Sequence, residues 1–237
     1  MKLVYKTLIS LHKHILKAKT LRGIVQKAIE DTISNWENDT LRQETVITDI
    51  LGTRIQDRLN DIESGDVNFT SLFIPDHGKG TMEKNLGADL AASMKIIYST
   101  YVIRKLFLAQ AKIVTGDKIK RNLLKDLKTQ CENMLSISPY SIVMLYSSEW
   151  IYVVPVADAR DISTKILKQK RGSINFKEDL YYMRLEQYIE DVYTTWQGDR
   201  VIGSFVETLG DLQHLLEVIP ARTGLSIIVS QNEQTQE

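Results

Sequence analysis

The sequence predicts an α/β fold, with a mixed central sheet flanked by helices and with a helical extension at its N-terminus. Three observations predict it. Apolar residues recur every three or four positions through the first 60 residues, which is the period of a helix face. Between residues 67 and 156, short segments rich in β-branched and aromatic residues alternate with turn residues, as strands do. An amphipathic helical segment lies between these strands, so helices and strands alternate along the chain.

The composition allows one main domain. The chain has 237 residues, of which 43% are hydrophobic, so it can bury a sizeable core. We expect an N-terminal helical extension over residues 1–38, a main domain over 39–230 and a disordered tail over 231–237. The tail is predicted to be disordered because it is polar and contains no apolar residue.

Charge and cysteine content limit the partners and the compartment. The 30 basic and 30 acidic residues balance, so the chain as a whole is not a polycation that coats nucleic acid. No stretch of 18 uninterrupted apolar residues occurs, so we expect no membrane partner. Cys131 is the single cysteine, which excludes an internal disulfide and favours a buried structural thiol. These features together predict a cytoplasmic protein.

The first 36 residues show helical periodicity, and we expect two helices that separate near Thr20–Gly23. The segment from Met1 to Ile29 carries seven basic residues and no acidic ones. A nucleic-acid arm, an oligomerisation element and a cap over the core are the three roles open to it. Of these three roles, the cap over the core is favoured.

A further helix is expected to begin near Asp39 or Thr40, either of which can cap it. Its buried stripe recurs every four residues, at Ile47, Leu51, Ile55 and Leu59. Glu44 falls on this stripe, so its carboxylate should face inward and need a cation. The alternative is a carboxylate that the helix macrodipole favours at this N-terminus.

Three strands should follow this helix: Val67–Ile74, a strand that Asp89 opens and that runs to Tyr98, and Leu106–Val114. The last of these is apolar except for Gln110 and Lys112, which share one face because strand side chains alternate. A lysine in so apolar a strand needs a carboxylate partner. Asp89 is the nearest candidate.

Two other acidic residues, Asp76 and Glu83, precede Asp89 in the sequence. Asp76 follows a proline within the turn-rich loop of residues 75–80, and no strand follows it directly, so Asp89 is preferred. Glu83, six residues before Asp89, is a possible additional acid of the site.

The remainder of the chain continues the α/β pattern. A helix capped by Asp117 is expected to run to Leu135. The later elements should be strands over Ser141–Tyr146 and Trp150–Val156, a basic segment with Lys165, Lys168, Lys170 and Arg171, helices over Phe176–Trp196 and Phe205–Val218, a turn at Gly198-Asp199 and a last strand over Leu225–Val229.

The tripeptides Gly87-Ala88-Asp89 and Gln110-Ala111-Lys112 resemble the motifs of the PD-(D/E)XK nuclease superfamily, and most of all its Mrr-like restriction endonucleases. The resemblance covers residues 40–156 and implies a restriction-endonuclease-like αβββαβ core. The chain departs from the motif at Ala88, which replaces proline. It departs again at Gln110, where a carboxylate would bind a metal more firmly.

The resemblance implies a Mg²⁺-dependent or Mn²⁺-dependent endonuclease that hydrolyses phosphodiester bonds in DNA, in restriction or antiviral defence. The catalytic set would be Asp89, Gln110, Lys112 and Glu44. Asp89, Glu44, the Gln110 amide oxygen and the Ala111 carbonyl would hold the metal, because Mg²⁺ prefers hard oxygen ligands. Lys112 would orient the attacking water. Two alternatives stay open: a buried Asp89–Lys112 ion pair with a purely structural role, and a nuclease-fold subunit that binds nucleic acid or assembles without catalysis.

A second basic cluster follows the third strand, and it predicts a nucleic-acid contact. The cluster consists of Lys118, Lys120, Arg121, Lys125 and Lys128. A solvated helix face is the alternative. DNA is the expected partner, and the resemblance leaves open a homo-oligomer or a partner subunit of a defence system.

Other catalytic classes lack their signatures. The four histidines have no zinc-binding spacing, and neither GxSxG nor GxGxxG occurs.

Overall fold

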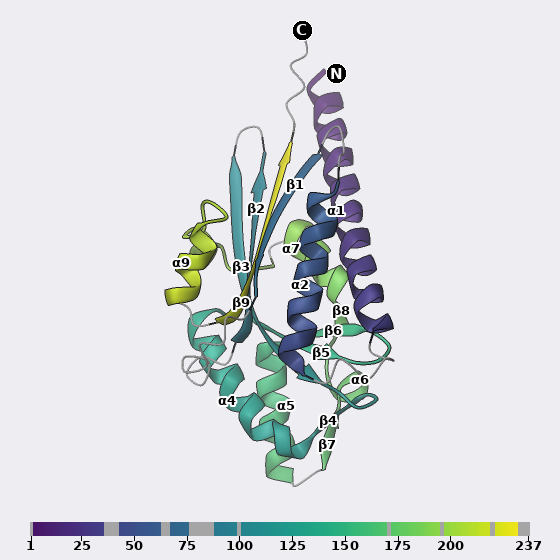
Figure 1. The fold of residues 1–237 in the computed structure, drawn as a ribbon, viewed down its shortest axis with the longest axis vertical. Helices are drawn as coiled ribbons and strands as arrows, with labels where there is room; N and C mark the ends of the chain where they lie inside the picture. The colour runs from purple at the N-terminus through teal and green to yellow at the C-terminus, as the bar shows by residue number, and fades with distance from the viewer. Residues whose placement is uncertain are drawn as a thin grey trace.

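The structure, a computed structural model, describes residues 2–35, 43–62, 67–75, 88–98, 101–169, 172–194, 197–218 and 221–231. It confirms the α/β class: a seven-stranded mixed sheet is flanked by helices (Figure 1). The sheet strands are β1 (Val67–Ile74), β2 (Ala88–Ile97), β3 (Val102–Ile113), β5 (Ile142–Tyr146), β6 (Ile151–Pro155), β8 (Met183–Arg184) and β9 (Ala221–Gln231). Their order across the sheet is β1-β9-β2-β3-β5-β6-β8.

The sheet is mixed because both kinds of pairing occur in it. β2 pairs antiparallel with β3, and β3 pairs parallel with β5 across α4 (Arg121–Ile137). β9, from the end of the chain, lies between β1 and β2; it is antiparallel to β1 and parallel to β2. The predicted last strand, Leu225–Val229, is therefore longer than expected and occupies an interior place in the sheet.

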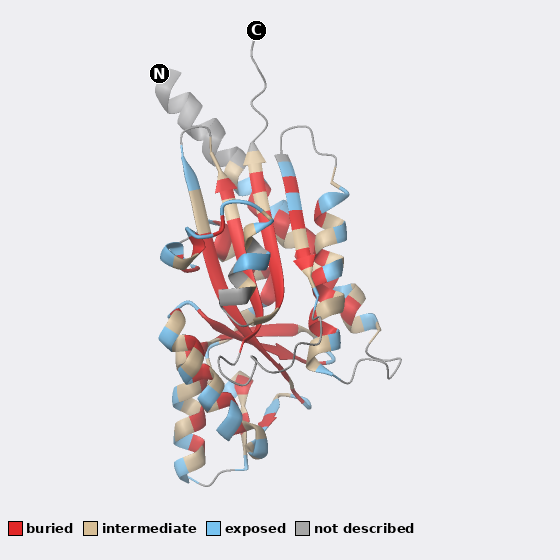
Figure 2. Cartoon of the chain, turned by 60° about the vertical axis from the view of Figure 1, so that its left-hand side comes forward, coloured by how far each residue is buried: buried red, intermediate tan, exposed pale blue. Residues whose placement is uncertain are grey.

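Helices cover both faces of the sheet, and alternate residues of each strand contact different helices. On one face, Leu90 and Ala109 share a buried cluster with α1 (Lys2–Ser34), α2 (Glu44–Asn60) and α7 (Leu185–Thr194). On the other face, Ala91 and Leu108 share a cluster with α4 and α5 (Val156–Gln169). Figure 2 shows the buried residues concentrated in the sheet and on the helix sides that face it.

The N-terminal helices prove to be one helix, α1, which continues through the expected break at Thr20–Gly23. A helical glycine costs about 1 kcal/mol relative to alanine. The glycine here is Gly23, and the nearby residues Leu21, Val25 and Ala28 are fully buried. Burying a large apolar side chain such as that of Leu21 or Val25 contributes about 1.5–3 kcal/mol. The free energy gained by burying these side chains therefore exceeds the cost of a glycine inside the helix. These residues belong to the same cluster as α2 and the sheet, as a cap over the core requires.

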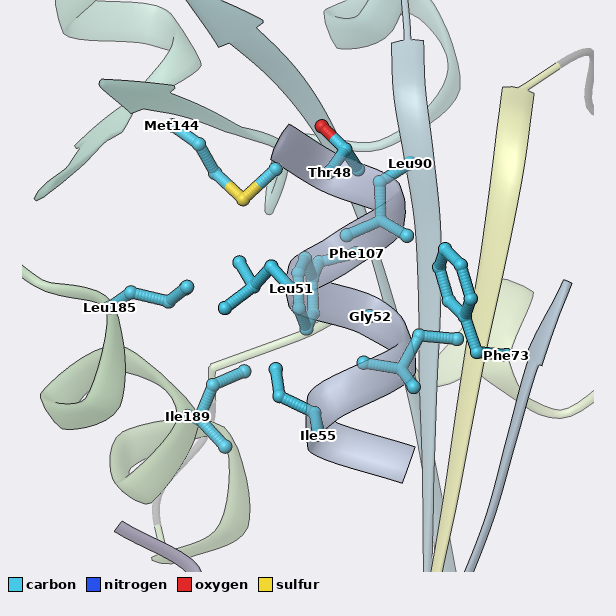
Figure 3. Close-up of a pocket in the computed structure, with 11 residues that line it drawn as sticks. Thr48, Leu51, Gly52, Ile55, Phe73, Leu90, Phe107, Met144, Leu185 and Ile189 are labelled. Carbon is cyan, nitrogen blue, oxygen red and sulfur yellow. The ribbon is translucent and has the colours of Figure 1, made fainter. Parts of the chain in front are cut away.

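α2 lies very close to the sheet at Gly52. A Cβ atom built there would come within 2.1 Å of the Phe73 ring of β1, so only glycine allows this approach. A small cavity of about 20 Å³ remains beside this contact, between α2, α7 and the sheet (Figure 3). Its lining is almost entirely apolar, and such cavities stay dry.

Several elements differ from the sequence-based expectation. Residues 118–120, predicted as helix, form strand β4 (Lys118–Lys120), which pairs with β7 (Ser173–Asn175), so α4 begins at Arg121. Lys165 and Lys168 of the predicted basic segment lie in α5, a helix that was not predicted, and Lys170 and Arg171 lie outside the described residues.

The two predicted C-terminal helices are interrupted. Residues 176–196 contain α6 (Phe176–Asp179), β8 and α7, because the Asn175 side chain caps the first turn and Met183 pairs with β6. Residues 205–218 contain only α9 (Asp211–Val218), and the preceding α8 (Arg200–Gly203) is capped by Asp199. The predicted turn is confirmed at Gly198, whose φ is 89°.

The helix expected to begin near Asp39 or Thr40 begins instead at Glu44, with Gln43 at the N-cap position, so neither predicted residue caps it. Other predicted features lie outside the described residues: the domain boundary at residue 38, most of the loop with Asp76, Glu83, and all of the tail after Gln231. Within the described part of the chain, no helix has the length and apolar character that a membrane span needs.

Candidate active site

The pairing of β2 with β3 assembles the centre of the site. Leu90 pairs with Ala109, so Asp89 lies directly across from Gln110. Lys112 is two residues further along β3 and shares the Gln110 face, as strand alternation predicts. The three side chains are buried, with residue exposures of 3% for Asp89, 2% for Gln110 and 7% for Lys112.

The Asp89 carboxylate is bound by β3. Its Oδ2 atom accepts hydrogen bonds from the Gln110 side-chain amide and from the Ala111 N–H, the latter at 2.7 Å. The same Gln110 Nε2 also donates to the Ala111 carbonyl at 3.1 Å. The amide nitrogen of Gln110 therefore lies between the two oxygens that were expected to hold a cation, and the amide oxygen does not face Asp89.

Glu44 reaches this group from the first turn of α2. Its Oε2 atom lies 3.2 Å from the Lys112 ammonium, and its Oε1 atom accepts from the Ile113 N–H at 3.0 Å. Glu44 thus faces inward, as its place on the apolar stripe predicts, and it pairs with Lys112. The buried lysine has this carboxylate as its direct partner, whereas the sequence had suggested Asp89.

Burial dominates the electrostatics of Asp89 and raises its pKa to about 6. The Ala111 N–H and the positive charge of Lys112 oppose this rise, Glu44 adds to it, and Arg222 opposes it. A carboxyl group whose pKa is raised by desolvation beside a lysine is typical of functional sites.

Cys131, which α4 buries, has its pKa raised to about 12 by burial, although the charge of Lys112 partly offsets this. It is therefore a neutral thiol, in agreement with the structural role that was predicted.

Other residues near the site gave no signal in the sequence. Thr223 of β9 donates its hydroxyl to the Asp89 carbonyl at 2.9 Å, and Arg222 precedes it. Both come close only because β9 lies beside β2. Tyr146 of β5 and Thr48 of α2 share a buried hydrogen bond of 2.7 Å next to Glu44. An apolar strand and a helix face gave no reason to single these two out.

A second buried lysine on β3 has a different role. Lys105 donates to the Val192 carbonyl in the last turn of α7, where a helix leaves carbonyl groups without intrahelical partners. Burial and the charge of Arg200 lower its pKa to about 8. Lys105 therefore supports α7, and Lys112 is the lysine of the site.

The oxygen donors at the site match the chemistry of Mg²⁺ or Mn²⁺. Mg²⁺ binds through one or two carboxylates and keeps several waters. Asp89, Glu44 and the Ala111 carbonyl could supply such a set. The described residues contain no group of three or more His, Cys, Asp or Glu side chains placed to hold a metal ion.

The predicted basic cluster is divided between two elements. Lys118 and Lys120 are exposed on β4, and Lys125 is exposed on α4. Lys128 pairs with Glu132 at 2.8 Å, and Arg121 donates to the Leu167 carbonyl at 3.3 Å. Three of the five cations are thus exposed to solvent, and the other two have partners within the protein.

Comparisons with protein-family models, with curated proteins and with solved structures found no match for this chain. Function is therefore inferred from the residues and their geometry.

Proposed function

We propose that the protein is a Mg²⁺-dependent or Mn²⁺-dependent endonuclease that hydrolyses phosphodiester bonds in DNA, in restriction or antiviral defence. One observation carries the proposal: Asp89 lies across from Gln110 on paired strands, and Glu44 meets Lys112 beside them. Residues from three elements, α2, β2 and β3, thus come together, and this convergence supports the proposal.

The order of elements also supports this proposal. α2, β1, β2, β3, α4 and β5 occur in this order along the chain, with the short β4 between β3 and α4, and β3 runs parallel to β5. This order is the one expected of a restriction-endonuclease-like core. The insertion of β9 between β1 and β2 is a departure from consecutive placement of the first strands.

Each residue has a role in this proposal. Asp89, Glu44 and the Ala111 carbonyl would hold the cation, which when bound supplies positive charge at the scissile phosphate and acidifies a water. Lys112 would donate a hydrogen bond to the attacking water and offset phosphate charge, and the desolvated site strengthens that interaction. Lys118, Lys120 and Lys125 would contact the DNA backbone, which adds salt-sensitive affinity without sequence preference.

A second function has its own support. Gln110 and the Ala111 N–H satisfy Asp89, while Lys112 and the Ile113 N–H satisfy Glu44. Both acids therefore have partners without a cation. This arrangement suits a non-catalytic nuclease-fold subunit that binds nucleic acid or assembles with a partner.

Cleavage assays separate the two functions. Purified wild-type protein and the Lys112→Ala variant should be incubated with methylated and unmethylated plasmid DNA and with RNA, in Mg²⁺, in Mn²⁺ and in a chelator. Lys95→Ala is the matched control, because Lys95 lies on β2 and bonds the Glu207 carbonyl away from the site.

The endonuclease proposal expects metal-dependent cleavage of DNA by the wild type and by Lys95→Ala, and none by Lys112→Ala. Equal cleavage by the wild type and Lys112→Ala would refute the assignment of Lys112. Absence of cleavage across all substrates would favour the non-catalytic subunit.

A further inference from the structure

We propose that Tyr146 is a positioning residue that fixes Glu44 at the candidate active site, an inference that rests on the proposed function. The Tyr146 hydroxyl lies 2.7 Å from Thr48 Oγ1. Thr48 donates its single hydroxyl hydrogen to the Glu44 carbonyl at 2.8 Å. Tyr146 must therefore be the donor to Thr48, and a chain of two hydrogen bonds joins β5 to the first turn of α2.

α2 needs this support because its N-terminus lacks the usual cap. Gln43 occupies the N-cap position and makes no side-chain capping bond. The first N–H groups of a helix have no intrahelical partners, and an uncapped first turn frays more readily. The Tyr146–Thr48 contact holds that turn from the side, one helical turn after Glu44.

Tyr146 also fixes the strand that Glu44 contacts. It is fully buried on β5, where its backbone pairs with Ile113, and its carbonyl accepts from the Val114 N–H at 2.9 Å. The Ile113 N–H instead donates to Glu44. Tyr146 thus contacts both the end of β3 and the first turns of α2, where Glu44 binds β3.

The Tyr146 hydroxyl stays protonated over the physiological range. Burial raises its pKa, the bond to Thr48 opposes the rise, and the nearby charges of Asp89 and Glu44 add to it. The hydroxyl therefore remains a hydrogen-bond donor to Thr48.

Tyr146→Phe removes the hydroxyl and keeps the ring. The matched control is Tyr188→Phe. Tyr188 lies on α7 and is also buried, and its hydroxyl donates to the Tyr140 carbonyl at 3.3 Å. The first measurement is metal-free amide hydrogen exchange at Ile113, relative to Leu108 in the centre of β3. Because a hydrogen bond of ordinary strength is lost, Ile113 should exchange about fivefold faster in Tyr146→Phe and at the wild-type rate in Tyr188→Phe.

Thr48 supplies a second pair of variants. Thr48→Val removes the hydroxyl that links Tyr146 to Glu44, and Thr48→Ser keeps it. We expect Thr48→Val to reproduce the faster Ile113 exchange and Thr48→Ser to restore the wild-type rate. Adding Tyr146→Phe to Thr48→Val should cause little further change, because both substitutions break the same chain.

The second measurement is the affinity for Mn²⁺ by calorimetry, which should fall about fivefold in Tyr146→Phe and stay unchanged in Tyr188→Phe. Unchanged Ile113 exchange in Tyr146→Phe, or equal acceleration in Tyr188→Phe, would overturn the positioning role. Equal Mn²⁺ affinity in wild type and Tyr146→Phe would overturn it too. Faster Ile113 exchange in a protein whose wild type binds no Mn²⁺ would support the positioning of Glu44 and refute the proposed metal site.

Discussion

Replacing Asp89 with asparagine should stabilise the metal-free protein. Asp89 is 3% exposed, and burial raises its pKa from the ordinary 3.8 to about 6. Between these values the folded state binds more protons than the unfolded state, so the free energy of unfolding falls as the pH rises through this window. Above pH 6 the destabilisation by the charged carboxylate is complete.

The magnitude follows from the two pKa values. Their difference, 6 minus 3.8, is about 2.2, and each pKa unit corresponds to 1.36 kcal/mol, which gives roughly 3 kcal/mol. Asparagine is neutral, and its side-chain oxygen can still accept from the Ala111 N–H and from Gln110. Asp89→Asn should therefore raise the free energy of unfolding at neutral pH by about 1–3 kcal/mol, which for a chain of this length raises Tm by roughly 2–4 °C per kcal/mol.

The assay is urea and thermal unfolding in a chelator at pH 8 and at pH 4. The gain should be present at pH 8 and largely absent at pH 4, where wild-type Asp89 is protonated in the folded state. Asp126→Asn, at an exposed position of α4, should change nothing. A destabilised Asp89→Asn protein at pH 8, or a gain of equal size at both pH values, would refute the reasoning that burial of this charge opposes folding.

Three further predictions concern the site, the basic cluster and the packing of α2. Gln110→Glu places a second carboxylate directly across from Asp89, so in a chelator it should lower the free energy of unfolding by about 1–3 kcal/mol. Mn²⁺ should then raise the Tm of this variant more than it raises the Tm of the wild type. An equal Mn²⁺ response in both proteins would argue against a cation at Asp89. Changing Lys118, Lys120 and Lys125 together to glutamate should weaken binding to all DNA sequences alike and flatten its salt dependence in fluorescence anisotropy, whereas unchanged affinity would identify a solvated face. Gly52→Ala should destabilise the protein by about 1–3 kcal/mol, because the added Cβ meets the Phe73 ring. Gly23→Ala should stabilise it by about 1 kcal/mol, because the Cβ added there meets nothing within 4 Å. Similar denaturation midpoints for the two variants would contradict the packing described.

The sequence by itself determined the parts of the site that depend on local periodicity. Gln110 and Lys112 share a face because strand side chains alternate, and a short hairpin fixes the pairing that sets Asp89 across from Gln110. Glu44 could be placed by the four-residue spacing of the α2 stripe. Each of these inferences uses residues within one element or in two elements that are adjacent along the chain.

Only the tertiary structure decided which acid pairs with Lys112 and which strand borders β2. Lys112 and Glu44 are 68 residues apart, and Asp89 and Thr223 are 134 residues apart. Inside the sheet, the Ser93 hydroxyl donates to the Ser226 hydroxyl at 2.9 Å, so two buried polar groups in β2 and β9 satisfy each other. Local sequence patterns carry no information on such pairs, because each of these residues taken alone is only a polar residue in an otherwise apolar segment. The pairing is favourable only when the complete sheet brings both residues together and removes water from them.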